Sequence, residues 1–228
     1  MTPAELAEDT LAFVRASPMF EPLEREGYVY VAGRSTGRVT RVRRVDVAAV
    51  REEAHARGAA RVEWWLGWNA PPNAQAELAD AGLVPDEMPE LTGMTCDREP
   101  PAPRGIEIRA ASAEEVVGLE HAVWGSEPDP PVDDPVVRHF AAVVDGEAVG
   151  VGRSVDMDGG VALMGGVVLP SHRGRGVYRT LVRARWEHAA ARGTPLLVVQ
   201  AGDLSAPVLR GIGFRTHGVV HVYRDPHL

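Results

Sequence analysis

Hydrophobic positions in the first hundred residues follow two different spacings. Apolar residues three to four positions apart predict helices at 2–15, 46–57 and 73–82, and the last two of these stop at a glycine. Alternating or continuous apolar runs predict strands at 27–32, 38–45, 61–66 and 91–97. The stretch 20–26 follows neither spacing and is interpreted as a connector.

A proline-rich stretch at 98–105 interrupts this pattern, and it predicts a division into domains at residues 1–99 and 104–228. Beyond it, Ser112 and Glu115 form the capping-box pattern that opens a helix. The pair Asp145-Gly146 lies between two apolar runs and is typical of a hairpin turn.

The second half alternates between the two spacings to its end. An acidic, proline-rich loop is expected at 125–135, with a helical turn at 135–138. The spacings predict strands at 106–109, 140–144, 148–155, 161–169, 196–200 and 219–223, and helices at 112–123, 177–192 and 205–211.

The stretch 167–181 joins a strand to a helix through a glycine-rich turn. Pro170 ends the strand, because proline cannot donate to a sheet ladder. The first N–H groups of a helix lack partners inside it and lie at the positive end of its dipole. Glycines and arginines alternate at 173–176, so the turn combines free approach of a phosphate with positive charge. The pattern predicts a pyrophosphate site.

The turn lacks the G-x-G-x-x-G and G-K-[ST] patterns of nucleotide sites. It resembles the coenzyme A-binding turn of the GNAT superfamily of N-acetyltransferases, which reads R/Q-x-x-G-x-G/A after a V-x-x-P strand end. Arg173 and Gly176 fill the first two fixed positions, whereas Tyr178 stands where Gly or Ala is usual. The resemblance implies acetyl-CoA as co-substrate, bound at Val167, Val168, Leu169, Arg173, Gly174, Arg175, Gly176, Val177 and Tyr178.

A second signature lies at 205–214, which is similar to a variant of the family's N-x-x-A-x-x-L-Y-x-x-x-G-F ending. Leu209 takes the position of the family's tyrosine, which commonly protonates the leaving thiolate. The resemblance implies an α/β (α+β) fold for 104–228, with a mixed, mostly antiparallel central sheet flanked by helices. The first half repeats the order of elements without an R-x-x-G-x-G turn before Asp46. We therefore weigh two interpretations of it, a degenerate GNAT-like copy in tandem and an unrelated α/β cap.

Composition narrows the functions that remain open. The formal net charge of −8 argues against nucleic acid as the main partner. We expect no membrane span, because apolar runs stay short of ~20 residues, and no signal peptide at the N-terminus. The lone Cys96 is read as a passive residue and fits the cytoplasm. We expect no metal, and a monomer or a homodimer.

Direct acetyl transfer needs a base for the amine and can use an acid for the thiolate. A backbone N–H at the end of the strand before the turn can serve as an oxyanion-type donor. Candidates for the base are Glu120 and His121 near the end of the first helix, and the carboxylates of the loop after it. Tyr178, Ser205 and Tyr223 are candidates for the acid, although a thiolate leaves without one (thiol pKa ~8.5).

The acceptor side is placed by the resemblance at the acidic loop after the first helix of the second domain. Its candidate acceptor-binding residues are Trp124, Glu127, Asp133 and Asp134, with Asp129 nearby. Each carboxylate can also be a solvated loop residue, and Trp124 can be a core residue.

Three functions remain open at this point. The preferred function is N-acetylation of a primary amine on a small, cationic molecule. The second is acetylation of a protein or peptide, which needs an open groove. The third is a non-catalytic acyl-CoA-binding regulatory module, which the missing tyrosine at position 209 favours.

Overall fold

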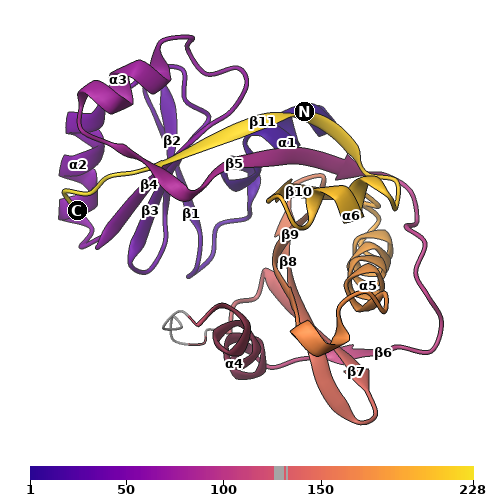
Figure 1. The fold of residues 1–228 in the computed structure, drawn as a ribbon. Coiled ribbons are helices and arrows are strands. Elements are labelled where there is room, and N and C mark those ends of the chain that lie inside the picture. Colours follow the sequence, from indigo (N-terminus) through magenta and orange to yellow (C-terminus); the bar gives the residue numbers. More distant parts are fainter. Residues whose placement is uncertain (126–130, 132) are drawn as a thin grey trace. The chain divides into compact units, whose positions relative to one another are not determined.

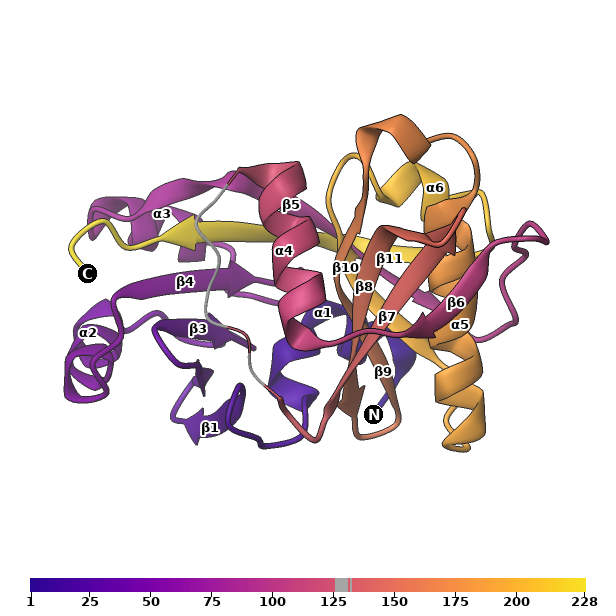
Figure 2. The ribbon, with the colours of Figure 1, turned by 90° about the horizontal axis from the view of Figure 1, so that it is seen from below.

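The structure is a computed structural model that describes residues 1–125, 131 and 133–228. The chain forms two compact units, and neither is a single continuous segment. The first contains residues 1–94, 200–207 and 216–228, and the second contains 95–199 and 208–215. Figures 1 and 2 show the ribbon in two views.

The first unit is built from most of the N-terminal half and the last strand of the chain. Its strands follow the order β1-β2-β3-β4-β11-β5. Its elements are α1 (Pro3–Glu8), η1 (Thr10–Phe13), β1 (Glu21–Arg25), β2 (Tyr28–Ala32), β3 (Thr36–Thr40), α2 (Val47–Ala56), β4 (Arg61–Leu66), α3 (Ala74–Asp80), β5 (Val84–Cys96) and β11 (Arg215–Arg224). The ends of β5 and β11 cross the boundary between the units.

The core of this unit lies between the sheet and the helices α2 and α3. Trp64 of β4 and Tyr30 of β2 are its largest aromatic side chains, and both are almost fully buried. They pack with Val50 of α2 and Leu78 of α3. Burying a side chain of this kind contributes ~1.5–3 kcal/mol, so these contacts fix both helices on one face.

The second unit carries the glycine-rich turn. Its strands follow the order β10-β9-β8-β7-β6. Its elements are β6 (Glu107–Ala110), α4 (Ala113–Trp124), β7 (Val137–Val144), β8 (Glu147–Met157), β9 (Gly160–Val168), η2 (Pro170–His172), α5 (Val177–Ala191), β10 (Leu197–Ala201) and α6 (Ala206–Arg210), with β10 and α6 reaching into the first unit.

Helices α4 and α5 cover opposite faces of β7, β8 and β9. Neighbouring side chains on a strand point to opposite faces. On β8, Arg153 meets Glu120 of α4, and the neighbouring Gly152 faces Arg185 of α5. The predicted fold class is confirmed, since helices flank a mixed sheet whose described pairs are mostly antiparallel, with parallel pairs at β3–β4 and β9–β10.

The two units repeat one topology. In the first, β1, β2 and β3 form an antiparallel meander, and α2 crosses over to β4, which pairs in parallel with β3. In the second, β7, β8 and β9 form the same meander, and α5 crosses over to β10, which pairs in parallel with β9. The C-terminal strand β11 pairs with β4 of the first unit.

Several predicted elements of the first half need correction. The helix expected at 2–15 ends at Glu8, and a 3-10 turn at Thr10–Phe13 follows it. The expected connector contains β1, an exposed edge strand whose charged residues and Pro22 hide the pattern. The strand expected at 38–45 is β3, which ends at Thr40 because Arg41 adopts a left-handed backbone with φ 53°.

In the second half, the helical turn expected at 135–138 is wrong from Val137 onward, because β7 begins there. The capping box at α4 is only half formed. Ser112 Oγ accepts from Glu115 N at 3.2 Å, but the Glu115 carboxylate pairs with Arg109. The hairpin at Asp145-Gly146 is confirmed, with φ values of 53° and 82°.

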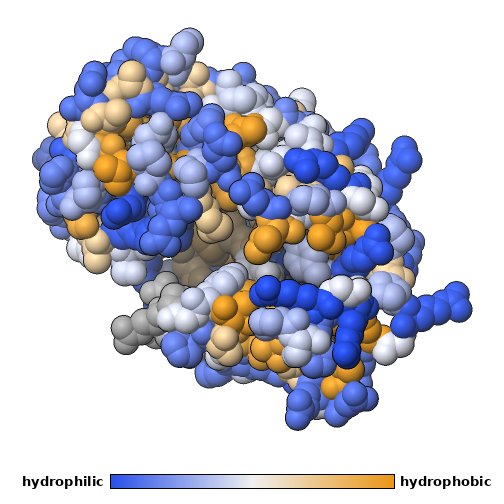
Figure 3. Space-filling model, in the orientation of Figure 1, coloured by the Kyte–Doolittle hydropathy of each residue, from blue (hydrophilic) through white to orange (hydrophobic). Residues whose placement is uncertain are grey.

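Hydrophilic residues cover much of the face drawn in Figure 3, with hydrophobic residues in scattered groups. In the part of the chain that the structure describes, no helix is long and apolar enough to cross a membrane.

Candidate active site

The glycine-rich turn leads from β9 into α5. The N–H of Leu169 donates to Val149 O at 2.9 Å, which keeps the end of β9 beside β8. Gly174 and Gly176 have φ values of 76° and 86°, a region that other residues avoid. A Cβ built on Gly174 would meet no atom within 4 Å, so this part of the turn is open to a ligand.

Helix α5 begins without a side-chain cap. Its N-cap is Gly176, and within the described residues no side chain accepts from its first turn. These N–H groups therefore have the geometry and polarity that favour an anion. Arg175 is exposed beside them, and the Arg173 side chain curls back so that Nε donates to Val168 O at 3.2 Å.

Next to the turn, β9 departs from regular sheet geometry. It pairs with β10 in register only at Val161 and Ala162. Further along, its register with β8 shifts opposite Gly152, where Gly165 adopts φ 48° and Gly166 is exposed. Such bulges re-aim the backbone and are common beside active sites. Here the bulge leaves an accessible stretch of backbone between the turn and the last β10 pair.

An ion pair lies over the bulge on the α4 face. Arg153 donates through both terminal nitrogens to the two oxygens of Glu120, at 2.6 and 2.5 Å. A Cβ on Gly165 would lie 2.5 Å from an atom of each side chain, so only glycine leaves room for this pair. Burial raises the pKa of the Glu120 carboxyl, and the Arg153 charge opposes that rise. The predicted base is thus at the bulge, with both of its oxygens engaged.

Tyr178 and Arg185 lie over the bulge on the α5 face. A Cβ on Gly166 would lie 2.9 Å from the Tyr178 ring and 3.7 Å from Arg185 Nη2. The Arg185 guanidinium lies 5.9 Å from the centre of that ring. Tyr178, the residue that departs from the family pattern, therefore borders the exposed backbone of Gly166.

The predicted acceptor residues differ in their surroundings. Trp124 ends α4 and is 56% exposed, which excludes a core role. Asp133 is exposed, but Asp134 is buried and accepts from Val136 N at 2.9 Å. Asp134 therefore shapes the entry to β7. Glu127 and Asp129 lie outside the described residues.

The other candidate acids belong to the first unit. Ser205 Oγ donates to Gly202 O at 3.1 Å, and Tyr223 donates to Gln75 at 3.1 Å. Leu209, at the family's tyrosine position, is a fully buried residue of the second unit. It packs in the interior and offers no proton.

Three residues at the bulge escaped the sequence analysis. Arg153 and Arg185 approach it from β8 and α5, and His139 of β7 lies opposite Arg153 in the β7–β8 register. Burial lowers the pKa of His139, and the Arg153 charge adds to this. No pattern or motif marks these residues. The alternation of β8 could have placed Arg153 and Gly152 on opposite faces of the sheet, but it could not have identified Glu120, 33 positions away, as the partner of Arg153.

The helix of the first unit that corresponds to α5 begins quite differently. At α2 the N-cap is Asp46, whose carboxylate accepts from Ala49 N at 3.1 Å. The N–H groups of Arg43 and Arg44 donate to Gly27 O at 2.6 and 3.0 Å. These three N–H groups, two before the helix and one in its first turn, are thus bonded within the chain itself.

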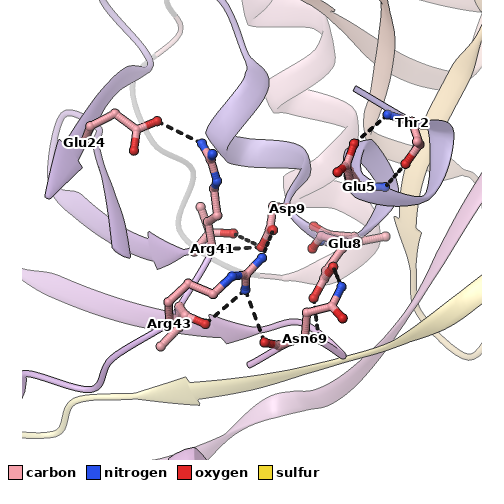
Figure 4. A network of polar contacts seen from close by, with 11 residues as sticks. Thr2, Glu5, Glu8, Asp9, Glu24, Arg41, Arg43 and Asn69 are labelled. Atoms are coloured by element: carbon pink, nitrogen blue, oxygen red, sulfur yellow. Dashed lines mark hydrogen bonds and ion pairs between the residues drawn. The ribbon is translucent and has the colours of Figure 1, made fainter. Parts of the chain in front are cut away.

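A buried acidic group completes this arrangement (Figure 4). Asp9 accepts from Arg41 N at 2.8 Å, and Arg43 approaches it at 3.7 Å. The neighbouring Glu8 accepts from both the backbone and the side chain of Asn69 at 2.5 Å. Asp9 therefore accepts from the N–H that follows β3, and Glu8 fixes the loop after β4.

Comparisons with known proteins identify the second half. Residues 109–214 match the model of the acetyltransferase (GNAT) family. The chain therefore carries a GNAT acetyltransferase domain over these residues. Among curated proteins, a sequence search finds no match.

Solved structures show the same fold over nearly the whole chain. A GCN5-related N-acetyltransferase from Kribbella flavida has a TM-score of 0.71 at 18% identity, covering 98% of this chain and 95% of its own. A tandem GNAT protein from the clavulanic acid biosynthesis pathway has a TM-score of 0.54 at 16% identity, covering 98% and 87%. A functionally unknown Staphylococcus epidermidis protein has a TM-score of 0.64 at 11% identity, covering 90% and 94%.

Proposed function

We propose that the protein transfers an acetyl group from acetyl-CoA directly to a primary amine of a small, cationic molecule. The observation that carries this proposal is the N-terminus of α5, which has no side-chain cap and is preceded by open space around Gly174. The GNAT match over the same residues supports it. The turn 173–178 would hold the pyrophosphate of acetyl-CoA, and Val167, Val168 and Leu169 would border the thioester.

The chain would contribute proton transfer and positioning at the bulge. The Glu120 carboxylate, held by Arg153, would accept a proton from the amine directly or through a water. His139 is a second candidate, because its lowered pKa favours the neutral imidazole that a base requires. Tyr178 would protonate the thiolate from the other face of the sheet.

The first unit is proposed to be a degenerate copy that does not bind acetyl-CoA. The repeated meander and crossover support a common origin, as does the likeness to a tandem GNAT protein. Asp46 supports the loss of binding, because a carboxylate at the first turn of α2 would repel a pyrophosphate. The protein is expected to act as a monomer or homodimer, away from membranes and nucleic acid.

Leu209 favours one alternative, a module that binds acyl-CoA without catalysis. A buried leucine at the position of the usual acid would fit a domain that has lost turnover. Acetylation of a protein or peptide is the other alternative. Thiol release from acetyl-CoA over a panel of amines and peptides separates the three functions, because a binding module releases none and a small-molecule enzyme ignores peptides.

The cofactor site is tested with a matched pair at Gly174. Asparagine and aspartate tolerate a left-handed backbone, so both substitutions fit the turn. We expect Gly174→Asp to remove most of the thermal stabilisation by CoA, since its charge repels the pyrophosphate, and Gly174→Asn to retain more of it. Equal CoA affinity in both variants would place the cofactor elsewhere. Gly176 is unsuitable for this test, because a Cβ there would lie 2.4 Å from Pro103.

A further inference from the structure

Arg185 is a buried cation in the middle of the second unit. It lies on α5 with 1% of its surface exposed. Its Nε donates to Leu181 O at 3.0 Å, and its Nη1 donates to Arg153 O at 3.4 Å. Its third nitrogen, Nη2, is buried and has no hydrogen-bond partner among the described residues.

The charge of this guanidinium is not balanced by a carboxylate in the part of the chain that the structure describes. Glu120 pairs with Arg153 on the other face of the sheet, and Asp156 pairs with His188 and Arg192. An arginine keeps its proton in proteins, and buried charges are ordinarily paired. Burial lowers the pKa of Arg185, and the neighbouring Tyr178 opposes this. The charge of Arg185 is therefore left without a carboxylate partner among the described residues.

The unpartnered nitrogen lies next to the accessible backbone of the bulge. Arg185 packs against two glycines, since a Cβ on Gly152 would lie 3.1 Å from its Nη1 and one on Gly166 would lie 3.7 Å from its Nη2. Gly166 is exposed, and it lies beyond the last pair of β9 with β10. A side chain at Gly152 would press on the guanidinium, whereas a Cβ at Gly166 would only touch Arg185 and would clash with the Tyr178 ring.

The same layer holds another orphaned polar atom. Ser154 lies two residues after Gly152 on β8, so its side chain points to the same face, towards α5. It is fully buried, and its hydroxyl has no partner among the described residues. The Nη2 of Arg185 and the hydroxyl of Ser154 are thus two buried groups on one face without partners, and they are suited to a ligand with several acceptor oxygens.

We propose that Arg185 recognises a carboxylate on the acyl group, so that the enzyme uses acyl-CoA donors with a terminal carboxylate, such as malonyl-CoA or succinyl-CoA. This inference rests on the proposed function and widens its donor from acetyl-CoA to this class. The reaction keeps its balance: the amine nitrogen bonds to the thioester carbon, the C–S bond breaks, the thiolate takes the proton that the amine loses, and the carboxylate is unchanged.

Binding measurements test the proposal without knowledge of the acceptor. Succinyl-CoA and butyryl-CoA have acyl chains of the same length, and only the first carries a carboxylate. We expect calorimetry on the wild-type protein to give at least ~tenfold tighter binding of succinyl-CoA than of butyryl-CoA, a difference of ~1.4 kcal/mol. Propionyl-CoA and malonyl-CoA form a second, shorter pair of equal chain length.

A charge-removing variant adds an independent measurement. Arg185→Met replaces the buried cation by an apolar side chain of similar length, a change that proteins often tolerate. We expect it to abolish the preference for succinyl-CoA over butyryl-CoA while leaving the affinity for CoA within twofold. Arg183→Met is the matched control, because Arg183 is a partly exposed arginine on the same helix and pairs with Glu187.

Each outcome decides between the possibilities. Absence of binding by every CoA compound would refute the proposed function itself. Binding of propionyl-CoA and butyryl-CoA with no advantage for their carboxylated counterparts would refute only the role of Arg185, and would leave it as a structural link between α5 and β8. If Arg185→Met does not fold, the wild-type comparison of the donor pairs still decides.

Discussion

Single residues decide which helix N-terminus can receive an anion. At α5, Gly176 leaves the first N–H groups free, because it has no side chain to cap them. At α2, Asp46 supplies the capping carboxylate itself, and such a cap stabilises a helix by ~1 kcal/mol. The N-terminus of α5 is therefore left open, whereas that of α2 is closed by its own side-chain cap.

Asp9 is expected to make the stability of the first unit depend on pH. Burial raises the pKa of its carboxyl from 3.8 to about 6, and the charge of Glu8 adds to this. Because the folded protein holds this proton more tightly than the unfolded chain, the associated stability is complete below pH ~4 and is lost as the pH rises through about 6. A shift of this size corresponds to a change in the free energy of unfolding on the order of 3 kcal/mol between low and high pH.

Denaturation by urea at pH 4 and pH 7.5 measures this effect. Asp9→Asn should flatten the change in unfolding free energy between the two values, since asparagine can still accept from Arg41 N without titrating. Asp203→Asn, at an exposed position of the same unit, should leave the change as it is in the wild type. Parallel profiles for the wild type and Asp9→Asn would show that the carboxyl titrates normally.

Tyr178 is expected to act in turnover and not in cofactor binding. Its ring borders the exposed Gly166 backbone at the bulge. If its hydroxyl protonates the thiolate, Tyr178→Phe should lower kcat and leave CoA affinity unchanged. Steady-state rates and calorimetry measure the two quantities. A kcat within twofold of the wild type (~0.4 kcal/mol) would remove Tyr178 from this role.

At the scale of elements, the sequence predicted the order of the second unit well. The turn, the hairpin and α5 follow from local signals, namely Pro170, the glycines and Asp145-Gly146. The bulge of β9 was not predictable, because its glycines read as ordinary strand residues until the partner strand and both helices are in place. Arg185 escaped for a related reason, since an arginine in an amphipathic helix is normally exposed.

The bulge itself is expected to depend on Gly165. Alanine there would adopt an unfavourable φ of 48° and would meet Arg153 and Glu120 at 2.5 Å. We expect Gly165→Ala to lower the free energy of unfolding by about 1–3 kcal/mol and to reduce acetyl transfer. Gly118→Ala is the matched control, because this helical glycine has open space around its Cβ and the change should stabilise α4 by up to about 1 kcal/mol.

Thermal or urea unfolding of both variants checks this pair. The two substitutions add the same methyl group to the same unit, so they differ only in backbone conformation and contacts. A loss of stability at Gly165 no larger than that at Gly118 would mean that the ion pair and the bulge adapt easily to a side chain.

At the scale of the whole molecule, charge is the property that bears on the substrate. The chain has 32 acidic residues against 24 arginines, for a formal net charge of −8. A negative field attracts a cationic acceptor and raises its local concentration. The attraction can come from the net charge of the whole chain or from single carboxylates near the site. Asp133 distinguishes the two sources, because it is exposed and its charge raises the pKa of His139.

We therefore expect Asp133→Asn to raise the KM for the amine acceptor and to leave the KM for acetyl-CoA nearly unchanged. Asp145→Asn removes the same unit of charge at the β7–β8 turn, where asparagine suits the φ of 53°, and should change neither KM. Asp134 is left intact, because its carboxylate holds the backbone before β7.

Initial rates at 50 and 300 mM salt complete the test, since screening beyond a Debye length of ~8 Å at physiological ionic strength should weaken the effect of Asp133. Equal changes in the two variants would assign the attraction to net charge, and an acceptor KM insensitive to both substitutions and to salt would argue against a cationic acceptor.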